Sequence, residues 1–312
     1  MAGALGLVLT GNAVSIEGSH AVPVYVDNSL PIVGPARACV ISTGELPQGG
    51  GPPLAVRLAP LGTPAVGPAI PVYVVPGGGV LDTLAYTKKI QAMGPIAYWP
   101  MAEPSGSVAT DESGNGRNGA YTSVTLNQTG IGDGRTAASF DGTNSYNNVF
   151  GASLSAAFNG QQGSFVGWAK VSGAGVWTDG LTRRCILFQV DASNRVGIFK
   201  PTANNEMDML YVAGGTSLGA AKTTFSPTDW FHLGLTWNKT ADQVIFYVNG
   251  VAITPVSTGL GTFAGALSAT QTLIGSLNTG AAAQVWSGLL AHWAVFNSTL
   301  SAAAMLSAAT VN

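Results

Sequence analysis

From about residue 97 onward, short apolar runs alternate with clusters of turn-forming Gly, Asn, Asp and Ser. Each run has the length of a β-strand, and its branched and aromatic residues favour extended backbone. Asn249 and Gly250 follow one run, and both tolerate the positive φ angles of a two-residue hairpin turn. Many short strands joined by tight turns predict an all-β fold, either a two-sheet sandwich or a barrel. The clearest candidates lie at residues 164–171, 185–190, 195–199, 230–237 and 243–248, of which the second and third flank a turn and predict a hairpin.

Two segments carry a helical pattern instead. Residues 81–93 contain no Gly or Pro and space their apolar positions three to four apart, which predicts a short connecting helix. Asp82 or Thr83 would cap its start, and the Gly-Pro pair that follows would end it. Near the end of the chain, residues 301–306 predict a helical turn with Ser301 as the N-cap. Everything else beyond the connecting helix is expected to be strand, turn or loop.

The first 80 residues differ in composition from the rest. They hold 11 of the 17 prolines and 14 of the 42 glycines, and they contain no Trp or Phe. The motif Pro-Val-Tyr-Val occurs at residues 23–26 and again at 71–74. A proline inside such a run confines the strand to a sheet edge. We expect an ordered but thin β-rich arm that completes its core with neighbouring chains; the alternative is a flexible linker.

This contrast predicts the domain organisation. All seven tryptophans fall after residue 80, and large aromatic side chains carry much of the buried area of a core. Residues 1–80 are therefore expected to be an extended Pro/Gly-rich β arm for anchoring or assembly. Residues 81–94 are expected to be a short helix and linker, and residues 95–312 the sandwich domain.

The charge content excludes several classes of partner. The chain has 13 Lys+Arg and 15 Asp+Glu, a net charge of -2, so it lacks the basic excess that nucleic acids and anionic membranes require. No apolar run reaches the roughly 18–20 residues of a membrane-spanning helix. The start lacks the basic region of a signal peptide, so we expect no export by that route. Cys39 and Cys185 lie far apart and form neither a disulfide framework nor a metal cluster.

Several motifs after residue 97 occur in the order of a known family. They are residues 97–103, the Asp-x-Ser-Gly-Asn-Gly-x-x-Gly turn at 111–119, Phe-Asp-Gly at 140–142, Tyr-Val-Asn-Gly at 247–250 and the closing segments 273–275 and 288–300. Together they resemble the laminin-G-like, concanavalin A-like domains. The resemblance implies a two-sheet antiparallel jelly-roll sandwich. It implies this fold more than an activity, because members bind sugars, proteins or nothing known.

The arm resembles virion structural proteins of tailed bacteriophages. This second resemblance implies a non-enzymatic capsid decoration or tail-associated protein, assembled in the host cytoplasm and released by lysis. Its partners would be other virion proteins and copies of itself through residues 1–80, with a cell-surface glycan as a further partner of the sandwich. We expect no nucleic acid partner and no membrane insertion. The alternatives are a secreted or surface carbohydrate-binding module and, less favoured, a glycan-degrading enzyme.

The residues of catalytic type do not form a convincing active site. Sugar hydrolysis requires two carboxylates across a cleft, and Glu206 with Asp208 is the one pair at strand spacing. We favour a solvated sheet edge for this pair. His232 and His292 lie within apolar strands and are expected to be core residues. Cys185 is expected to be a buried, inert thiol, although two arginines precede it. We therefore assign no catalytic residue.

No cofactor is required, and calcium is the one candidate ion. Family members often hold calcium near the two glycine-containing turns, and oxygen ligands suit that ion. The matching positions are Asp111, Asn115, Asn118 and Asp141. Acidic residues that the family often has elsewhere are absent, since Ser145 and the segment 288–292 replace them. The alternative is that Asp111 and Asp141 fix turns through bonds to the backbone.

A glycan site would require an exposed aromatic platform beside amide and carboxylate groups. Trp177 and Asp179, in a Gly-rich loop, form one candidate, and Tyr146 between Asn144 and Asn147 forms the other. We expect these residues at a loop edge of the sandwich. The alternative is that Trp177 packs into the rim of the sandwich or against a neighbouring subunit.

Overall fold

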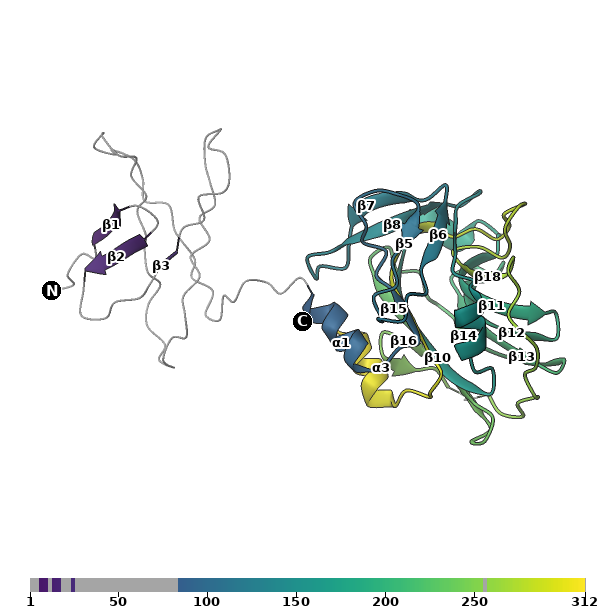
Figure 1. Ribbon diagram of the computed structural model, residues 1–312. Helices are drawn as coiled ribbons and strands as arrows, with labels where there is room; N and C mark the ends of the chain where they lie inside the picture. Colours follow the sequence, from purple (N-terminus) through teal and green to yellow (C-terminus); the bar gives the residue numbers. More distant parts are fainter. Residues whose placement is uncertain (1–5, 11–12, 18–23, 26–83, 255–256, 312) are drawn as a thin grey trace. The chain divides into compact units, whose positions relative to one another are not determined.

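A computed structural model describes residues 6–10, 13–17, 24–25, 84–254 and 257–311. Contacts divide the chain into two units, Met1–Asp82 and Thr83–Asn312, and each unit is described by itself. The second unit holds the sandwich and its helices (Figure 1). It carries all the functional candidates discussed below.

Three strands are described in the first unit. β1 (Gly6–Thr10), β2 (Ala13–Glu17) and β3 (Val24–Tyr25) form an antiparallel sheet in that order. The first copy of the Pro-Val-Tyr-Val motif supplies β3, which lies at the sheet edge as the proline requires. The second copy and the Gly-rich joint before the connecting helix lie outside the described residues, so the organisation of the arm stays a prediction.

The second unit is built on two antiparallel sheets. The first, called here the β10 sheet, contains β4 (Ala97–Trp99), β7 (Thr125–Thr129), β8 (Thr136–Asp141), β10 (Gln162–Val171), β15 (Phe231–Asn238), β16 (Gln243–Val248), β17 (Val251–Ala252) and β19 (Ser287–Phe296). Its strand order is β17-β16-β15-β10-β19-β8-β7, and β4 also pairs with β19.

The second sheet, called here the β12 sheet, faces the first. It contains β5 (Val108–Ala109), β6 (Gly119–Thr122), β9 (Tyr146–Asn148), β11 (Arg183–Asp191), β12 (Asn194–Lys200), β13 (Met207–Ala213), β14 (Thr216–Lys222) and β18 (Thr272–Ile274). Its order is β14-β13-β12-β11-β18-β9-β6-β5. The architecture confirms the predicted two-sheet jelly-roll sandwich.

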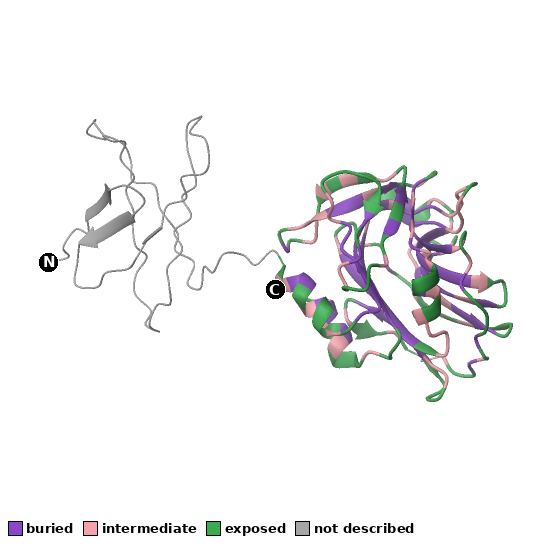
Figure 2. Cartoon of the chain, viewed as in Figure 1, coloured by how far each residue is buried: buried purple, intermediate pink, exposed green. Residues whose placement is uncertain are grey.

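The main core lies between the two sheets. Phe165 on β10 meets Phe188 on β11 with ring centroids 5.2 Å apart, which joins the sheets directly. Glycines let the largest side chains pack close to the backbone: a Cβ on Gly167 would lie 2.2 Å from the Trp293 ring. The central strands β10, β11, β15 and β19 are buried along almost their whole length, whereas buried and exposed residues alternate along β6 (Figure 2).

The predicted turns are confirmed where they can be checked. Asn249 and Gly250 join β16 to β17 with φ angles of 49° and 76°, the left-handed values that their side chains tolerate. β11 and β12 form the predicted hairpin, with Asp191 opposite Asn194. Both turns could be predicted from the sequence because their conformation depends on local residue types.

Helices α1 (Ala85–Ala92) and α3 (Ala302–Ala308) cover the outer face of the β10 sheet (Figure 1). Tyr86 of α1 donates its hydroxyl to the carbonyl of Ala308, 2.6 Å away, so the two predicted helices also hold each other. Ser301 accepts from the backbone N–H of Ala304 and is the predicted N-cap of α3. The residue at the start of α1 is Leu84, which makes no side-chain cap bond. Asp82 and Thr83, the caps expected from the sequence, lie outside the described residues.

Two short helical segments were not predicted. α2 (Ala152–Ala157) and the 3-10 segment η1 (Ala174–Thr178) both lie in Ala- and Gly-containing loops without a helical apolar pattern. Leu154 fixes α2 to the core, and Val176 and Trp177 fix η1 to it. Tertiary packing therefore determines these turns. No helix in the described part of the chain is long and apolar enough to cross a membrane.

Candidate functional site

Trp177 is not the exposed platform that the sequence indicated. Its side chain is 1% exposed, and its ring lies 5.5 Å from Phe225 and 5.8 Å from Phe231. Its indole N–H donates to the carbonyl of Pro227 at 2.8 Å. The alternative expectation, packing into the rim of the sandwich, describes its position, because a large apolar ring gains more from burial than from solvent contact.

Asp179 organises a cluster of charges beside Trp177. It accepts from Arg183 at 2.7 Å and from the buried Lys200 at 2.9 Å. Burial raises the pKa of Asp179, but hydrogen bonds from Lys200, the Leu181 backbone and Arg183 outweigh it, so the pKa is lowered. Arg183 also donates to the carbonyl of Gly142, which links this cluster to the turn that follows β8. Both carboxylate oxygens of Asp179 are thus used within the protein.

The second candidate group divides between the two sides of the β12 sheet. Asn147 lies opposite Tyr121 and Ile274, two core residues, so its fully buried amide points into the sandwich. Tyr146 therefore projects to the outer side and is half-buried, while Asn144 is exposed on the preceding turn. The structure thus places Tyr146 and Asn147 on opposite sides of the sheet, and Asn144 on the turn that Arg183 links to the Asp179 cluster.

Three of the predicted calcium positions lie in one loop. Asp111 accepts backbone N–H groups from Tyr98, Ser113 and Arg117 at 2.8–2.9 Å. Asn118 in turn accepts from the Asp111 N–H, at 2.8 Å. Asn115 donates to the carbonyl of Ile96 at 3.1 Å. These bonds fix the loop against β4, as the turn-fixing alternative expected.

Asp141 lies far from that loop. It accepts from the backbone N–H groups of Thr143, Asn144 and Ser145 and from the Ser145 hydroxyl. Asp141 lies opposite Ser287 on β19, whereas Tyr98, which binds Asp111, lies opposite Ala294. Seven residues of strand correspond to roughly 20 Å at about 3.3 Å per residue. The four positions therefore do not share one ion, and no metal-type cluster of His, Cys, Asp or Glu occurs among the described residues.

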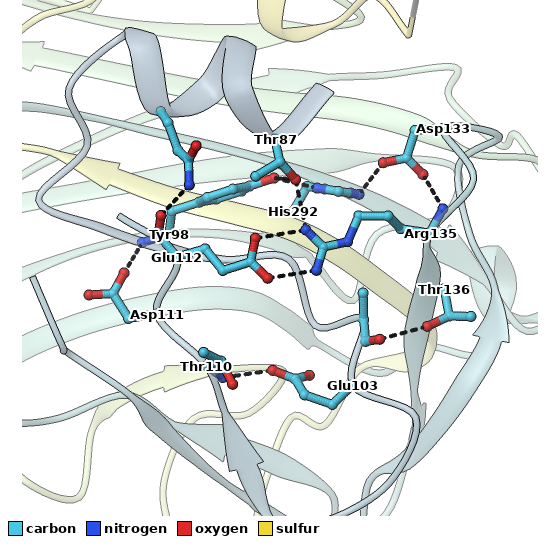
Figure 3. A network of polar contacts seen from close by, with 12 residues as sticks. Thr87, Tyr98, Glu103, Thr110, Asp111, Glu112, Asp133, Arg135, Thr136 and His292 are labelled. Carbon is cyan, nitrogen blue, oxygen red and sulfur yellow. Dashed lines mark hydrogen bonds and ion pairs between the residues drawn. The ribbon is translucent and has the colours of Figure 1, made fainter. Parts of the chain in front are cut away.

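A buried polar network lies beneath α1 (Figure 3). His292 is fully buried; its Nδ1 lies 2.6 Å from the Tyr98 hydroxyl and its Nε2 lies 3.0 Å from Asp133. A neutral ring that accepts from Tyr98 and donates to Asp133 satisfies both contacts. Burial lowers the pKa of His292 despite the raising effect of Asp133, which agrees with the neutral form. Its expected place in the core is confirmed.

Arg135 completes this network. It binds both oxygens of Glu112, at 2.7 and 2.6 Å, and donates to the Thr87 hydroxyl at 2.8 Å (Figure 3). Bidentate pairs of this kind are strong and hold a fixed geometry. Every charged group drawn beneath α1 has a partner, so this network attaches the helix to the sheet.

Two other candidates from the sequence, His232 and Cys185, are buried in uncharged form. His232 is fully buried, neither ring nitrogen has a hydrogen-bond partner in the described chain, and burial lowers its pKa to about 3. Its ring packs on Trp168 with centroids 5.3 Å apart. Cys185 is fully buried in the main core, and burial raises the pKa of its thiol. An uncharged imidazole and an uncharged thiol are the forms that this burial favours.

The outer side of the β12 sheet is different. Paired residues on neighbouring strands project to the same side, so the register defines three outward rows. These rows are Arg184–Phe199–Asp208, Leu187–Gly197–Leu210–Gly219 and Gln189–Arg195–Val212. We call this surface the outer face of the β12 sheet. It joins two arginines, a carboxylate and an amide to an apolar middle row.

Polar atoms on this face lack partners. The unpartnered atoms, each buried from solvent and without a hydrogen bond to any described residue, are Arg184 Nη1, Gln189 Oε1, Arg195 Nε and Asp208 Oδ1. Buried polar groups are nearly always bonded in folded proteins, so four exceptions on one face require an explanation. Two are donors and two are acceptors, which is the set that a polyhydroxylated ligand would satisfy.

The remaining contacts of these residues hold them in place. Arg184 donates from Nε to Gln284 at 2.8 Å and lies over the Phe199 ring, 4.4 Å from its centroid. Gln189 donates to Gln271 at 2.9 Å. These side chains are therefore held in place, which reduces the entropy lost on binding, while their unpartnered atoms lie just beneath the surface.

Asp208 shares this face with Glu206. Burial raises the pKa of Asp208 to about 7, and a hydrogen bond and charge repulsion from Glu206 add to the shift. The pair is not the solvated edge that the sequence favoured, because Asp208 is half-buried. Near neutral pH, Asp208 is thus a carboxyl group that can hold a proton and donate it in a hydrogen bond.

Two glycines leave the middle row of this face without side chains at two positions. A Cβ on Gly197 would lie 2.6 Å from the carbonyl oxygen of Ile186, so no side chain fits there. Gly219 is exposed, and a Cβ at that position would meet only the carbonyl oxygen of Met209 at 3.7 Å. The half-buried Leu210 between them offers the apolar contact that sugar C–H groups use.

The sequence analysis missed most of this face. Arg184 was considered only as a neighbour of Cys185, Asp208 was assigned with Glu206 to a solvated edge, and Arg195 was not considered. The available signal was the repeated placement of a polar residue between core residues on three successive strands. The register that aligns them is a long-range property.

Comparisons with known proteins agree with this architecture. A sandwich of two antiparallel sheets in this strand order belongs to the class of jelly-roll folds. The family model described as the concanavalin A-like lectin/glucanases superfamily, of the laminin G type, matches residues 141–305. The chain belongs to this family. No curated protein matches the chain.

Many solved structures share the fold. The botulinum neurotoxin serotype D ligand-binding domain, solved with N-acetylneuraminic acid, aligns with a TM-score of 0.52 at 12% identity, covering 70% of this chain and 52% of that one. A sialidase from Trypanosoma rangeli, solved with a difluoro-KDN compound, aligns with a TM-score of 0.50 at 12% identity, covering 69% and 32%. This chain thus spans about half of the neurotoxin domain's length. At this identity the likeness shows the fold alone.

Proposed function

We propose that this chain is a non-enzymatic carbohydrate-binding protein that holds a saccharide on the outer face of the β12 sheet. The observation that carries the proposal is the set of four unpartnered polar atoms on that face. A sugar hydroxyl both donates and accepts, so one saccharide can supply partners for the Arg184 and Arg195 donors and the Gln189 and Asp208 acceptors. Each bond left unmade costs about 1–3 kcal/mol, which a ligand would recover.

The apolar groups on the face support a sugar rather than a smaller polar ligand. Leu210 lies between the two glycines in the middle row, and the half-buried Phe199 ring lies in the row beside it. The C–H side of a pyranose ring packs on such groups while its hydroxyls reach the polar rows. Both structural relatives were solved with sialic-acid-type ligands, which is consistent with binding in this fold class.

The carboxylate pair gives one specific reason to consider a glycan-degrading enzyme instead. Hydrolysis places the substrate between two carboxyl groups, about 5–9.5 Å apart. Glu206 and Asp208 lie close enough to raise the pKa of Asp208, which places them side by side and not on opposite walls of a cleft. We therefore favour binding. Release of reducing sugar from a bound glycan, abolished in Glu206→Gln, would support the enzyme.

We further propose the cellular setting implied by the arm. Residues 1–80 would anchor the chain, through other virion proteins and copies of itself, to a bacteriophage particle as a capsid decoration or tail-associated protein. The Pro- and Gly-rich, apolar composition of that segment supports this role over a solvated tether. A secreted or surface carbohydrate-binding module is the alternative. Immunogold labelling of purified particles would support the virion role, and label found only in the soluble fraction would contradict it.

Two exposed glycines allow a direct test of the binding face. Gly219 lies on the outer face of the β12 sheet, and Gly175 lies in η1 beside Trp177, where a Cβ would meet nothing within 4 Å. Gly219→Trp should obstruct the proposed face, whereas Gly175→Trp should obstruct only the loop end. We expect the parent to bind members of a glycan array and Gly219→Trp to lose that binding at an unchanged melting temperature. No glycan binding by the parent, or loss in Gly175→Trp alone, would contradict the proposal.

A further inference from the structure

We infer that the saccharide is acidic and that its anionic group binds between Arg184 and Arg195. This inference rests on the proposed carbohydrate-binding function and assigns the chemical class of its ligand. It follows from Arg184, a buried cation on the outer face of the β12 sheet that forms no ion pair with any described residue, although Asp208 and Glu206 lie on the same face. The buried cationic side chains of this molecule differ in whether they form an ion pair.

Three cationic side chains are buried in the described chain: Arg183, Arg184 and Lys200. Arg183 and Lys200 both bind Asp179, at 2.7 and 2.9 Å. Arg184 forms no ion pair with any described residue; its partners are the neutral amide of Gln284 and the ring of Phe199. A buried charge without a counter-ion is unfavourable, so Arg184 is the exception that requires a partner.

Arg195 adds a second cation to the same face. It projects to the same side, opposite Gln189, and its Nε has no partner in the described chain. Its guanidinium is close enough to act on Arg184: burial first, and then the charge of Arg195, lower the pKa of Arg184 to about 10. Two like charges held together on a half-buried face are the arrangement that an anion stabilises.

The geometry favours an oxyanion. A guanidinium presents its N–H groups in a planar fork, and a carboxylate or sulfate accepts two of them at once. Arg184 Nη1 and Arg195 Nε have no partner among the described residues, and both are shielded from solvent, so an anion would reach them only if the two side chains shift outward. Gln189 Oε1, in the same row as Arg195, is left to accept a neighbouring hydroxyl. An acidic saccharide combines the anion and the hydroxyls in one ligand.

The test compares acidic glycans with matched neutral ones. Titration calorimetry on the full chain would use sialyllactose against lactose and a galacturonate hexamer against its carboxyl-reduced form. A sulfated galactan hexamer would distinguish sulfate from carboxylate. We expect at least one acidic probe to bind at least about tenfold more tightly than its neutral match, the effect of one charge-assisted hydrogen bond.

Variants then locate the anion. Arg195→Gln should reduce binding of the acidic probe about tenfold or more and leave any neutral binding unchanged. Arg184→Lys retains the charge but not the fork, and it should also weaken acidic binding. Lys88→Gln, on the exposed side of α1, removes one charge from the other side of the sandwich and should leave binding unchanged apart from weak long-range effects. Melting temperatures would identify any variant that fails to fold.

The outcomes separate the inference from the proposed function. Equal affinity for acidic and neutral probes, with both lost in Gly219→Trp, would overturn the acidic assignment and leave the carbohydrate-binding face in place. Acidic preference that persists in Arg195→Gln and Arg184→Lys would overturn the assignment of the two arginines. Failure of every glycan to bind would overturn both. Acidic preference lost with either arginine would support the inference.

Discussion

The two outer faces of the sandwich differ in whether their charged groups have partners within the chain. On the β10 sheet, α1 covers a network in which Arg135 binds Glu112 and His292 lies between Tyr98 and Asp133 (Figure 3). On the β12 sheet, Arg184 has no carboxylate partner and a free buried N–H. Beneath α1 the chain itself supplies partners for these charged groups, whereas neither ring nitrogen of His232 on the same side has a partner among the described residues. The second face lacks partners that only another molecule can provide.

This difference shows how burial distinguishes structure from recognition. A polar group that has its partners within the fold contributes to stability and resists change. A polar group held in place but without partners lowers stability slightly and becomes favourable when a ligand arrives. The same residue type, arginine, occurs in both roles here, so residue identity alone does not separate them.

The largest effect is expected from disrupting the polar network beneath α1 on the outer face of the β10 sheet, called here the closed face. Arg135→Met would leave the Glu112 carboxylate, 26% exposed, and the Thr87 hydroxyl without their partner. We expect a loss of about 2–3 kcal/mol in the free energy of unfolding, the cost of a charge-assisted bond to a partly buried group. For a unit of this size, that corresponds to a melting temperature lower by roughly 4–12 °C. Calorimetry measures it, and an unchanged melting temperature would remove the structural role of the network.

Acid should destabilise the closed face through His232. Its pKa is lowered to about 3 in the folded chain, so the unfolded chain binds the proton first as the pH falls below about 6.5. Stability should therefore decrease from about pH 6.5 toward pH 3, by at most about 1.4 kcal/mol per pH unit for this group. His232→Leu removes the group and should flatten this part of the curve. Denaturant unfolding across that range tests it, and parallel curves for parent and variant would contradict it.

The outer face of the β12 sheet, called here the open face, should make the free energy of unfolding depend on pH in the other direction, and more weakly. The pKa of Asp208 is raised to about 7, so the folded chain keeps a proton that the unfolded chain loses near pH 4. This contribution to stability is present below about pH 4 and is lost as the pH rises to about 7. Asp208→Asn should remove that slope, and Asp229→Asn, at an exposed carboxylate, is the matched control. A slope that remains in Asp208→Asn would assign the raised pKa elsewhere.

The smallest effect is expected at Arg184. Arg184→Met replaces an unpaired buried cation by an apolar chain of similar length, so stability should change by less than about 1 kcal/mol or increase. The paired comparison with Arg135→Met separates the two faces with the same substitution. Thermal unfolding of both variants measures it. A loss at Arg184 as large as that at Arg135 would mean that Arg184 has a structural partner.

The sequence predicted the parts of the fold that depend on local residue types. The Asn249-Gly250 turn, the hairpin about residues 191–194 and the Ser301 cap each follow from two to four neighbouring residues. Trp177 was assigned to an exposed loop because its neighbours are Gly and Ala. Its burial depends on Phe225 and Pro227, about 50 residues away, which no local pattern contains.

The binding face was less accessible to sequence analysis for the same reason. Arg184, Arg195 and Asp208 lie on three strands, and only their register places them on one side of the sheet. A register shift of one residue would move each strand's set to the opposite face. The predicted calcium positions show the converse: Asp111 and Asp141 match family turns, yet β19 holds those turns at opposite ends of the sandwich.

Hydrogen exchange with and without a bound saccharide tests the central claim most directly. The full chain would be exchanged alone and with the glycan that an array identifies, and peptides from both outer faces would be compared. We predict added protection in Arg183–Asp191, Asn194–Lys200 and Met207–Ala213, and none in Ala85–Ala92 or Ala302–Ala308. Protection confined to η1 and the turn after β8, or to the two helices, would contradict the assignment of the outer face of the β12 sheet as the binding site.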